Sequence, residues 1–130
     1  MTLKYKVIKQ KTPASTGEVR DIYYARACDR KMYDLDMVAK QLAKESTLSP
    51  ADIYATLVGL TDLIPLLLMD NNSVSLGSLG IFSLHFSSEV KNSKEEVNKR
   101  CIKGIKMKFR ASPKLKKRLR SPIFEKSKNK

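Results

Sequence analysis

Residues 105–110 alternate strictly between apolar and cationic side chains. In a strand, one face would carry Lys106, Lys108 and Arg110 at intervals of about 6.6–6.8 Å, and the other face would be apolar. That interval roughly matches the spacing of phosphates along one DNA strand. A strand that is merely half exposed usually carries charges of both signs, because like charges in a row repel one another. The pattern therefore favours a nucleic-acid-binding strand over a purely structural one.

The positive charge of the chain is concentrated in its C-terminal third. Residues 91–130 contain 16 Lys and Arg against 3 Asp and Glu, whereas residues 51–90 contain 4 acids and no Lys or Arg. This segregation indicates an apolar assembly platform joined to a polyanion-binding surface, and its alternative is a solvated surface with a disordered basic tail. Besides the three strand cations, the candidate phosphate-binding side chains are Lys91, Lys94, Lys99, Arg100, Lys103, Lys114, Lys116 and Lys117.

The chain lacks the residue groupings that enzymes and metalloproteins use. Its single histidine, His85, lies between Ser83 and Ser87 on the expected polar face of a strand. A Ser–His relay there would lack an orienting carboxylate and an oxyanion hole. Cys28 and Cys101 match no metal-ligand spacing and suit a reducing cytosol, with a disulfide between them as the alternative. We therefore expect no catalytic site, no metal, no cofactor and no small-molecule substrate.

The sequence also gives no sign of a membrane or secretory segment. No run of eighteen apolar residues occurs, so we expect nothing to span a membrane. The first nine residues alternate charged with apolar side chains and lack the hydrophobic region of a secretory signal. These observations predict a cytoplasmic protein without a membrane partner.

The N-terminal segment predicts a β-hairpin. Residues 3–11 alternate apolar with polar, largely lysine, side chains, which is typical of a strand with one solvated face. Pro13 and Gly17 delimit a turn, and Val19–Ala27 forms a second strand-like run. The tyrosines that could stack on bases, or pack in a core or interface instead, are Tyr5, Tyr23 and Tyr24.

Two helices should follow, and the second is apolar on nearly every side. Asp34 is a good N-cap for the first, and Ser49 followed by Pro50 is a strong start for the second. Residues 53–69 leave almost no polar face, so a domain of this size cannot cover them alone and we expect a subunit interface. Pro65 should kink this helix. The candidate dimer-interface residues are Leu57, Leu60, Leu63, Ile64, Leu67 and, from a later strand, Phe82.

From residue 74 onwards the apolar period changes to two, which predicts strands. Gly77 and Gly80 flank a tight turn between two of them. Residues 88–101 have almost no apolar content, so we expect an exposed, mobile excursion before the chain returns as the strand over 105–110.

The C-terminus should contain one short helix and a tail. Ser112 and Pro113 are typical of an N-cap and a first helical position, and they predict a helix over Lys114–Arg120. The last residues, Ser121–Lys130, are predicted to form a frayed basic tail.

Together these elements predict an α+β fold in three parts. Residues 1–33 would form an N-terminal hairpin extension, and residues 122–130 a basic tail. Between them, residues 34–121 would form a domain with a two-helix dimerisation body, a three-stranded antiparallel sheet and a short final helix. An extended β-arm would occupy about residues 87–103.

The run Val74–Leu84, Val-Ser-Leu-Gly-Ser-Leu-Gly-Ile-Phe-Ser-Leu, resembles the turn-and-strand motif of the HU/integration-host-factor family of bacterial histone-like proteins. That motif has the form V-x-L-x-G-[FL]-G-x-F. Upstream, the helix–Ser-Pro–helix unit of residues 34–69 is similar to the family's dimerisation body. Downstream, residues 105–115 are similar to the strand and helix that close its DNA-binding saddle. The segment before residue 34 is similar to the extension of a longer HU-related subgroup.

The resemblance implies an architectural protein that binds duplex DNA with low sequence specificity, as a homodimer or as a heterodimer with a related subunit. Bending or compaction of the DNA is the further property that it implies. It implies association with the nucleoid, and it gives the DNA-binding role to the strand, arm and final-helix cations named above.

The family inserts a proline at each arm tip between base pairs, but residues 87–103 contain no proline, and Val97 or Ile102 would be the apolar substitutes. Two further departures are Ser78, where the family's turn usually has its first glycine, and Pro65 in a helix that is usually uninterrupted.

Two other functions are compatible with the residues. A basic strand with tyrosines nearby does not by itself choose DNA, so the first alternative is an RNA-binding module. The second is a scaffold protein that works through the N-terminal hairpin and uses its basic end only as an anchor.

Overall fold

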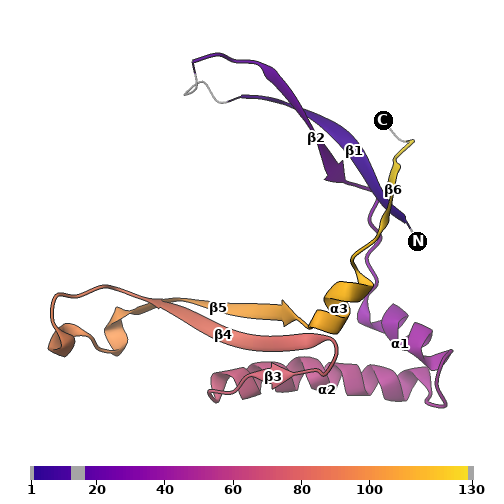
Figure 1. Ribbon diagram of the computed structural model, residues 1–130. Helices are drawn as coiled ribbons and strands as arrows, with labels where there is room; N and C mark the ends of the chain where they lie inside the picture. Colours follow the sequence, from indigo (N-terminus) through magenta and orange to yellow (C-terminus); the bar gives the residue numbers. More distant parts are fainter. Residues whose placement is uncertain (1, 13–16, 129–130) are drawn as a thin grey trace. The chain divides into compact units, whose positions relative to one another are not determined.

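The computed structural model describes residues 2–12 and 17–128. The chain divides into two compact units: Met1–Tyr33 together with Leu119–Lys130, here called the hairpin unit, and Asp34–Arg118, here called the helix–arm unit. The fold class is α+β, as predicted, and each unit contains one three-stranded sheet (Figure 1).

The two helices that open the helix–arm unit begin where the sequence predicts. Asp34 caps α1 (Leu35–Ala43) by accepting a hydrogen bond of 2.9 Å from the amide three residues on. Ser49 caps α2 (Pro50–Met69) in the same way at 3.1 Å. Each side-chain oxygen satisfies an amide that the first helical turn leaves without a partner. α2 continues through Pro65 to its last residue.

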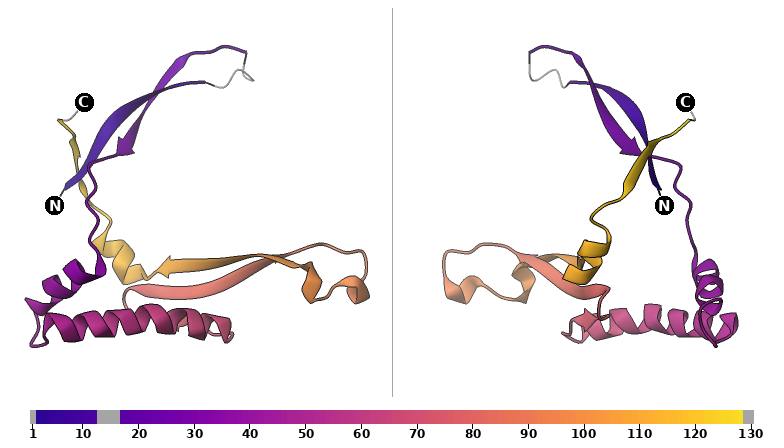
Figure 2. Two further views of the ribbon diagram at one scale, coloured as in Figure 1. Left: turned by 180° about the vertical axis from the view of Figure 1, so that it is seen from behind. Right: turned by 45° about the vertical axis from the view of Figure 1, so that its right-hand side comes forward.

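The sheet of the helix–arm unit is antiparallel with the order β3-β4-β5, which confirms the predicted three-stranded sheet. β3 is short (Val74–Ser75), whereas β4 (Gly80–Ser88) and β5 (Ile102–Ala111) are long and pair along most of their length. In every view the β4–β5 ribbon projects beyond the end of α2 (Figures 1 and 2). Only the far end of this ribbon, where Ser87 pairs with Lys103 and Ser88 with Ile102, falls within the segment expected to form the arm.

The turn between β3 and β4 depends on Gly80. Its φ is +152°, and a Cβ there would meet the carbonyl oxygen of Arg110 and lie 2.7 Å from the ring of Phe109. Gly77 also has a positive φ, +61°, but has open space around it. Only glycine therefore allows β5 to approach this close to the start of β4.

Ser112 joins the last helix of the unit to the same turn. Its hydroxyl donates to the carbonyl of Ser78 and accepts a hydrogen bond of 3.0 Å from the amide of Leu115. The helix itself, α3 (Pro113–Arg118), begins as predicted but ends two residues earlier than expected.

The arm tip differs from the expected mobile excursion. It contains two single 3₁₀ turns, η2 (Lys94–Glu96) and η3 (Lys99–Cys101). Cys101 is only 3% exposed, and its thiol contacts the carbonyl of Glu96 at 3.6 Å. No apolar run indicates this compaction, because it depends on one small buried side chain and on local hydrogen bonds.

The hairpin unit corrects the prediction of a frayed tail. β1 (Thr2–Lys11) pairs antiparallel with β2 (Asp21–Ala27), as expected, and its other edge pairs in parallel with β6 (Ile123–Lys126). The result is a mixed sheet with the order β2-β1-β6. Ile123 and Phe124 are good strand formers, but the lysines that follow them made the segment read as a basic tail. The predicted turn at residues 13–16 lies outside the described residues.

The chain on its own buries very little. Among the residues that the structure describes, the buried hydrophobic side chains are Ala39, Ile53, Leu68 and Cys101. On α2, Leu63, Leu66 and Met69 are 49%, 68% and 78% exposed. By length and its mean hydropathy of 1.6, α2 could also cross a membrane, although a single helix with this composition is weak evidence for that. Exposed apolar surface of this extent is typical of an interaction site.

Replacing Gly80 with alanine should destabilise the protein by about 3 kcal/mol, because the new methyl group clashes with β5 and the positive φ is strained. Gly77→Ala is the matched control and should cost only about 1 kcal/mol, since it adds strain without a clash. Urea unfolding at one protein concentration measures both. Equal unfolding midpoints for the two variants would contradict the close approach of β5 to Gly80.

Candidate nucleic-acid interface

One face of the β4–β5 ribbon carries the row of cations that the sequence predicts. In the register of the two strands, Lys106 lies opposite His85, Lys108 opposite Ser83, and Arg110 opposite Ile81. Residues directly opposite each other in an antiparallel pair project to the same face. Lys106, Lys108 and Arg110 are all exposed, and we call them the cation row.

The cation row has no local counter-charge. None of its three members forms an ion pair with any of the described residues, whose four salt bridges all lie elsewhere. The opposing positions on β4 supply a hydroxyl, an imidazole and an aliphatic side chain rather than a carboxylate. The row is therefore a strip of uncompensated positive charge, which is what a polyanion neutralises.

The opposite face of the ribbon is apolar. Phe82 lies opposite Phe109 with their ring centroids 4.9 Å apart, and Leu84 lies opposite Met107. Towards the arm, Ile105 is 67% exposed. The ribbon is thus amphipathic, and its apolar face is only partly covered by the chain's own helices.

The hydroxyl of Ser83 and Nε2 of His85 lie 2.8 Å apart on the cation face. Within the described part of the chain, no carboxylate bonds to the imidazole of His85. This pair adds two hydrogen-bonding side chains to the strip of charge, without the orienting carboxylate of a catalytic relay among the described residues.

Two of the predicted arm cations share one local carboxylate. The carboxylate of Glu89 forms ion pairs with Lys91, at 3.4 Å, and with Lys103 across the arm. Sequence reasoning counted these lysines as free phosphate-binding groups. The signal that could have corrected it was Glu89 itself, the acid two residues before Lys91.

The remaining predicted cations form two further groups. Lys94, Lys99 and Arg100 lie in the 3₁₀ turns of the arm tip, and α3 carries Lys114, Lys116 and Lys117. All six are exposed, and within residues 2–12 and 17–128 none of them has an ion-pair partner. The tip also carries Glu95 and Glu96, so its net charge is lower than its lysine content indicates.

The candidate dimer-interface residues do not all lie equally open. Leu63 is exposed, as is the neighbouring Leu66, which the sequence analysis did not single out. The other predicted members, all half buried within the chain itself, are Leu57, Leu60, Ile64, Leu67 and Phe82. The open apolar strip of α2 therefore centres on Leu63 and Leu66.

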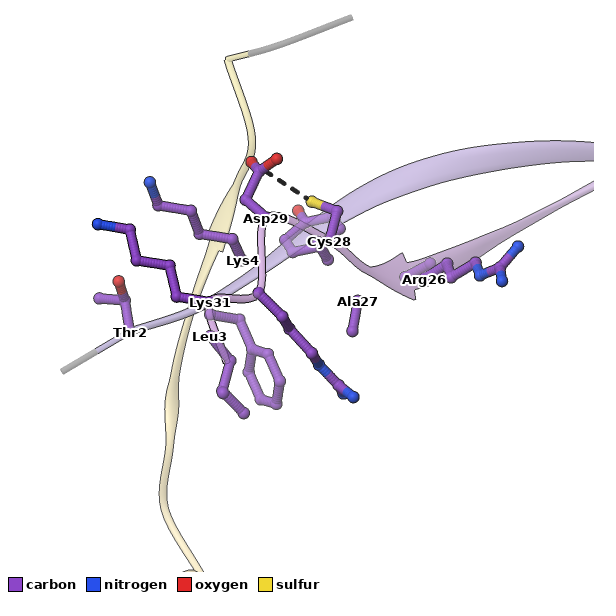
Figure 3. Close-up of a pocket in the computed structure, with 12 residues that line it drawn as sticks. Thr2, Leu3, Lys4, Arg26, Ala27, Cys28, Asp29 and Lys31 are labelled. Atoms are coloured by element: carbon purple, nitrogen blue, oxygen red, sulfur yellow. Dashed lines mark hydrogen bonds between the residues drawn. The ribbon is translucent and has the colours of Figure 1, made fainter. Parts of the chain in front are cut away.

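A separate hollow of about 840 Å³ lies in the hairpin unit, lined by the ends of its strands and by the segment after β2 (Figure 3). Leu3 and Lys4 leave β1 in opposite directions there, and the Cys28 thiol contacts the Asp29 carboxylate at 3.7 Å. Among the described residues, no group of three or more His, Cys, Asp or Glu could hold a metal ion. The cation row remains the strongest candidate site.

Comparison with known proteins agrees with this geometry. Residues 1–126 match the HU-HIG family, which is described as an HU domain fused to a wHTH, Ig or glycine-rich motif. The chain is also similar to a crystal structure from Bacteroides vulgatus ATCC 8482, of a protein provisionally assigned as a bacterial DNA-binding protein. The TM-score is 0.62 at 9% sequence identity, and the match covers 99% of this chain and 50% of that one.

The chain thus spans half the length of that crystallised protein, and an identity this low establishes a common fold alone. No curated protein matches the sequence.

Replacing Glu89 with glutamine should strengthen binding to duplex DNA, because it releases Lys91 and Lys103 for phosphates. The slope of log affinity against log salt should steepen by about 1 for each lysine released. Glu95→Gln makes the same charge change at the arm tip, where the acid has no ion-pair partner among the described residues. Fluorescence anisotropy across a salt series would measure both variants, and identical slopes for the two would contradict the pairing role of Glu89.

Proposed function

Because the chain belongs to the HU-HIG family, across residues 1–126, we propose that it is a dimeric architectural protein that holds duplex DNA. The observation that carries this proposal is the cation row, Lys106, Lys108 and Arg110, exposed on a projecting ribbon and free of ion pairs among the described residues. Phosphate neutralisation by these side chains would supply most of the affinity.

Low sequence specificity is expected because the described part of the chain has no helix suited to reading base edges. Phosphate contacts position a protein on DNA, whereas base edges in the grooves specify sequence. Among the described elements, α2 is apolar and α3 has six residues, so neither suits insertion into a major groove as a reading helix. The ribbon and arm would instead follow the duplex along the minor groove.

A second copy of the chain, or a related subunit, is the partner that the apolar surfaces favour. The strip of Leu63 and Leu66 on α2 and the apolar face of the ribbon both lie in the helix–arm unit, which also carries the cation row. Pairing the helices of two subunits would cover the strip and would place two cation rows on one saddle. The α2 helix would then be a core helix of the dimer rather than a membrane segment.

Sharp bending by intercalation is not part of the proposal. The arm has no proline, and its tip carries two acids beside Val97, which is 51% exposed. We propose a protein that coats or supports DNA in the cytoplasm, in association with the nucleoid, and that has neither a cofactor nor a small-molecule substrate.

Alanine at Lys106, Lys108 and Arg110 together should weaken binding to duplex DNA by several kcal/mol at low salt and should flatten its salt dependence. The dimer should stay folded, because the three side chains are exposed and make no ion pairs with other described residues. Anisotropy against DNA and RNA duplexes, with circular dichroism as the folding control, tests this. Unchanged affinity for duplex DNA would contradict the proposed DNA-binding role of the cation row. A loss of affinity confined to RNA would favour the RNA-binding alternative.

Leu63→Asp should dissociate the dimer by placing a charge in its apolar interface, at a cost of about 3 kcal/mol or more. Met32→Asp adds the same charge at a side chain that is 88% exposed in the hairpin unit and should leave the dimer intact. Light scattering after gel filtration reports the mass of each. A dimeric Leu63→Asp protein would show that the interface lies elsewhere.

A further inference from the structure

The hairpin unit has a basic face that the saddle does not use. In the register of β1 and β2, Lys6 lies directly opposite Arg26, and Lys4 lies two residues earlier on β1 and so on the same face. We call Lys4, Lys6 and Arg26 the hairpin cation cluster. All three are exposed.

Two like charges directly opposite each other on a sheet destabilise it, and they normally have an acid nearby. The other face of the same hairpin follows that rule, because Lys9 forms an ion pair of 3.2 Å with Asp21. Within the described residues, neither Lys6 nor Arg26 has such a partner. The cluster therefore keeps an unfavourable pair that an external anion would relieve.

The surroundings of the cluster add to its positive charge. Arg30 and Lys31 line the hollow beside Lys4, and in Figure 3 Lys4 and Lys31 point towards the same side. The acid that lines this hollow, Asp29, is already engaged, since its carboxylate accepts a hydrogen bond of 2.5 Å from the Ser127 hydroxyl. The Cys28 thiol contacts the same carboxylate oxygen, and among the described residues no ion pair joins Asp29 to Lys4, Arg30 or Lys31.

The cluster also has a hydroxyl-bearing aromatic neighbour. Tyr24 lies opposite Ile8, one pair further along the same face, and is 43% exposed. Tyrosine hydroxyls are common phosphate contacts in protein–DNA interfaces. Lys4 and Lys6 are two residues apart, at the interval of about 6.6–6.8 Å found in the cation row. Lys4 lies in register with Glu125 of β6, whereas the pairing with β6 ends before Lys6, so no acid lies in register with Lys6 or Arg26.

We propose that this face of the hairpin unit is a second phosphate-binding surface for duplex DNA, separate from the saddle and centred on Lys6 and Arg26. The choice of duplex DNA as the ligand rests on the proposed function, whereas the existence of an anion-binding face rests on the hairpin alone. The surface adds phosphate contacts, and therefore salt-dependent affinity, to those of the cation row.

The test is the double variant Lys6→Ala with Arg26→Ala, measured by anisotropy on duplex DNA across a salt series. The matched control is Lys9→Ala with Lys11→Ala, which removes two cations from the opposite face of β1. The double variant should lower the magnitude of the salt slope by about 2, one for each lost phosphate contact, and the control should leave it unchanged.

Thermal melting separates binding from folding. Because the double variant removes a repulsive pair, its melting temperature should equal or exceed that of the wild type. Equal slopes for the double variant and its control would overturn the proposal, and so would a loss that appears only with RNA or with an acidic protein as the ligand.

The triple alanine variant of the cation row, run in parallel, distinguishes the two proposals. If only the triple variant loses affinity, the saddle stands and the hairpin surface fails. If only the double variant loses affinity, the hairpin surface stands and the saddle fails.

Discussion

The register of β5 against β4 is the constraint on which the rest of the structure depends. Because side chains on a strand alternate between faces, this register puts Lys106, Lys108 and Arg110 on one side and the apolar residues on the other. A slip of one residue would exchange the two faces completely. Gly80 and Ser112 hold the register at the base of the ribbon, one through a close approach that only glycine permits and the other through hydrogen bonds to the turn and to α3.

The same alternation that gathers the cations also creates an apolar face that the chain cannot cover. α2 presents a similar problem, with Leu63 and Leu66 exposed on a helix that lacks a polar side. Burial of such surface is the main force that holds subunits together, so the proposed charge saddle and the proposed dimer are two consequences of one amphipathic design. The arm differs from the cation row, because there the carboxylate of Glu89 forms ion pairs with Lys91 and Lys103 within the chain.

Sequence reasoning succeeded where the signal was local. Asp34 and Ser49 cap their helices as their types and positions predict, and the alternation at 105–110 gives a strand with a basic face. It failed where a distant partner decides the structure. Nothing near Ile123 indicates that this segment pairs with the free edge of β1, and the folding of the arm tip around Cys101 depends on contacts rather than on composition.

The central claim is that phosphate neutralisation by unpaired cations holds duplex DNA. The most direct test is equilibrium binding of the wild-type protein to a linear duplex at several salt concentrations. If about 6–8 phosphates are neutralised, log affinity should fall against log salt with a slope of about −5 to −7. A slope near zero, or no binding at low salt, would contradict the account.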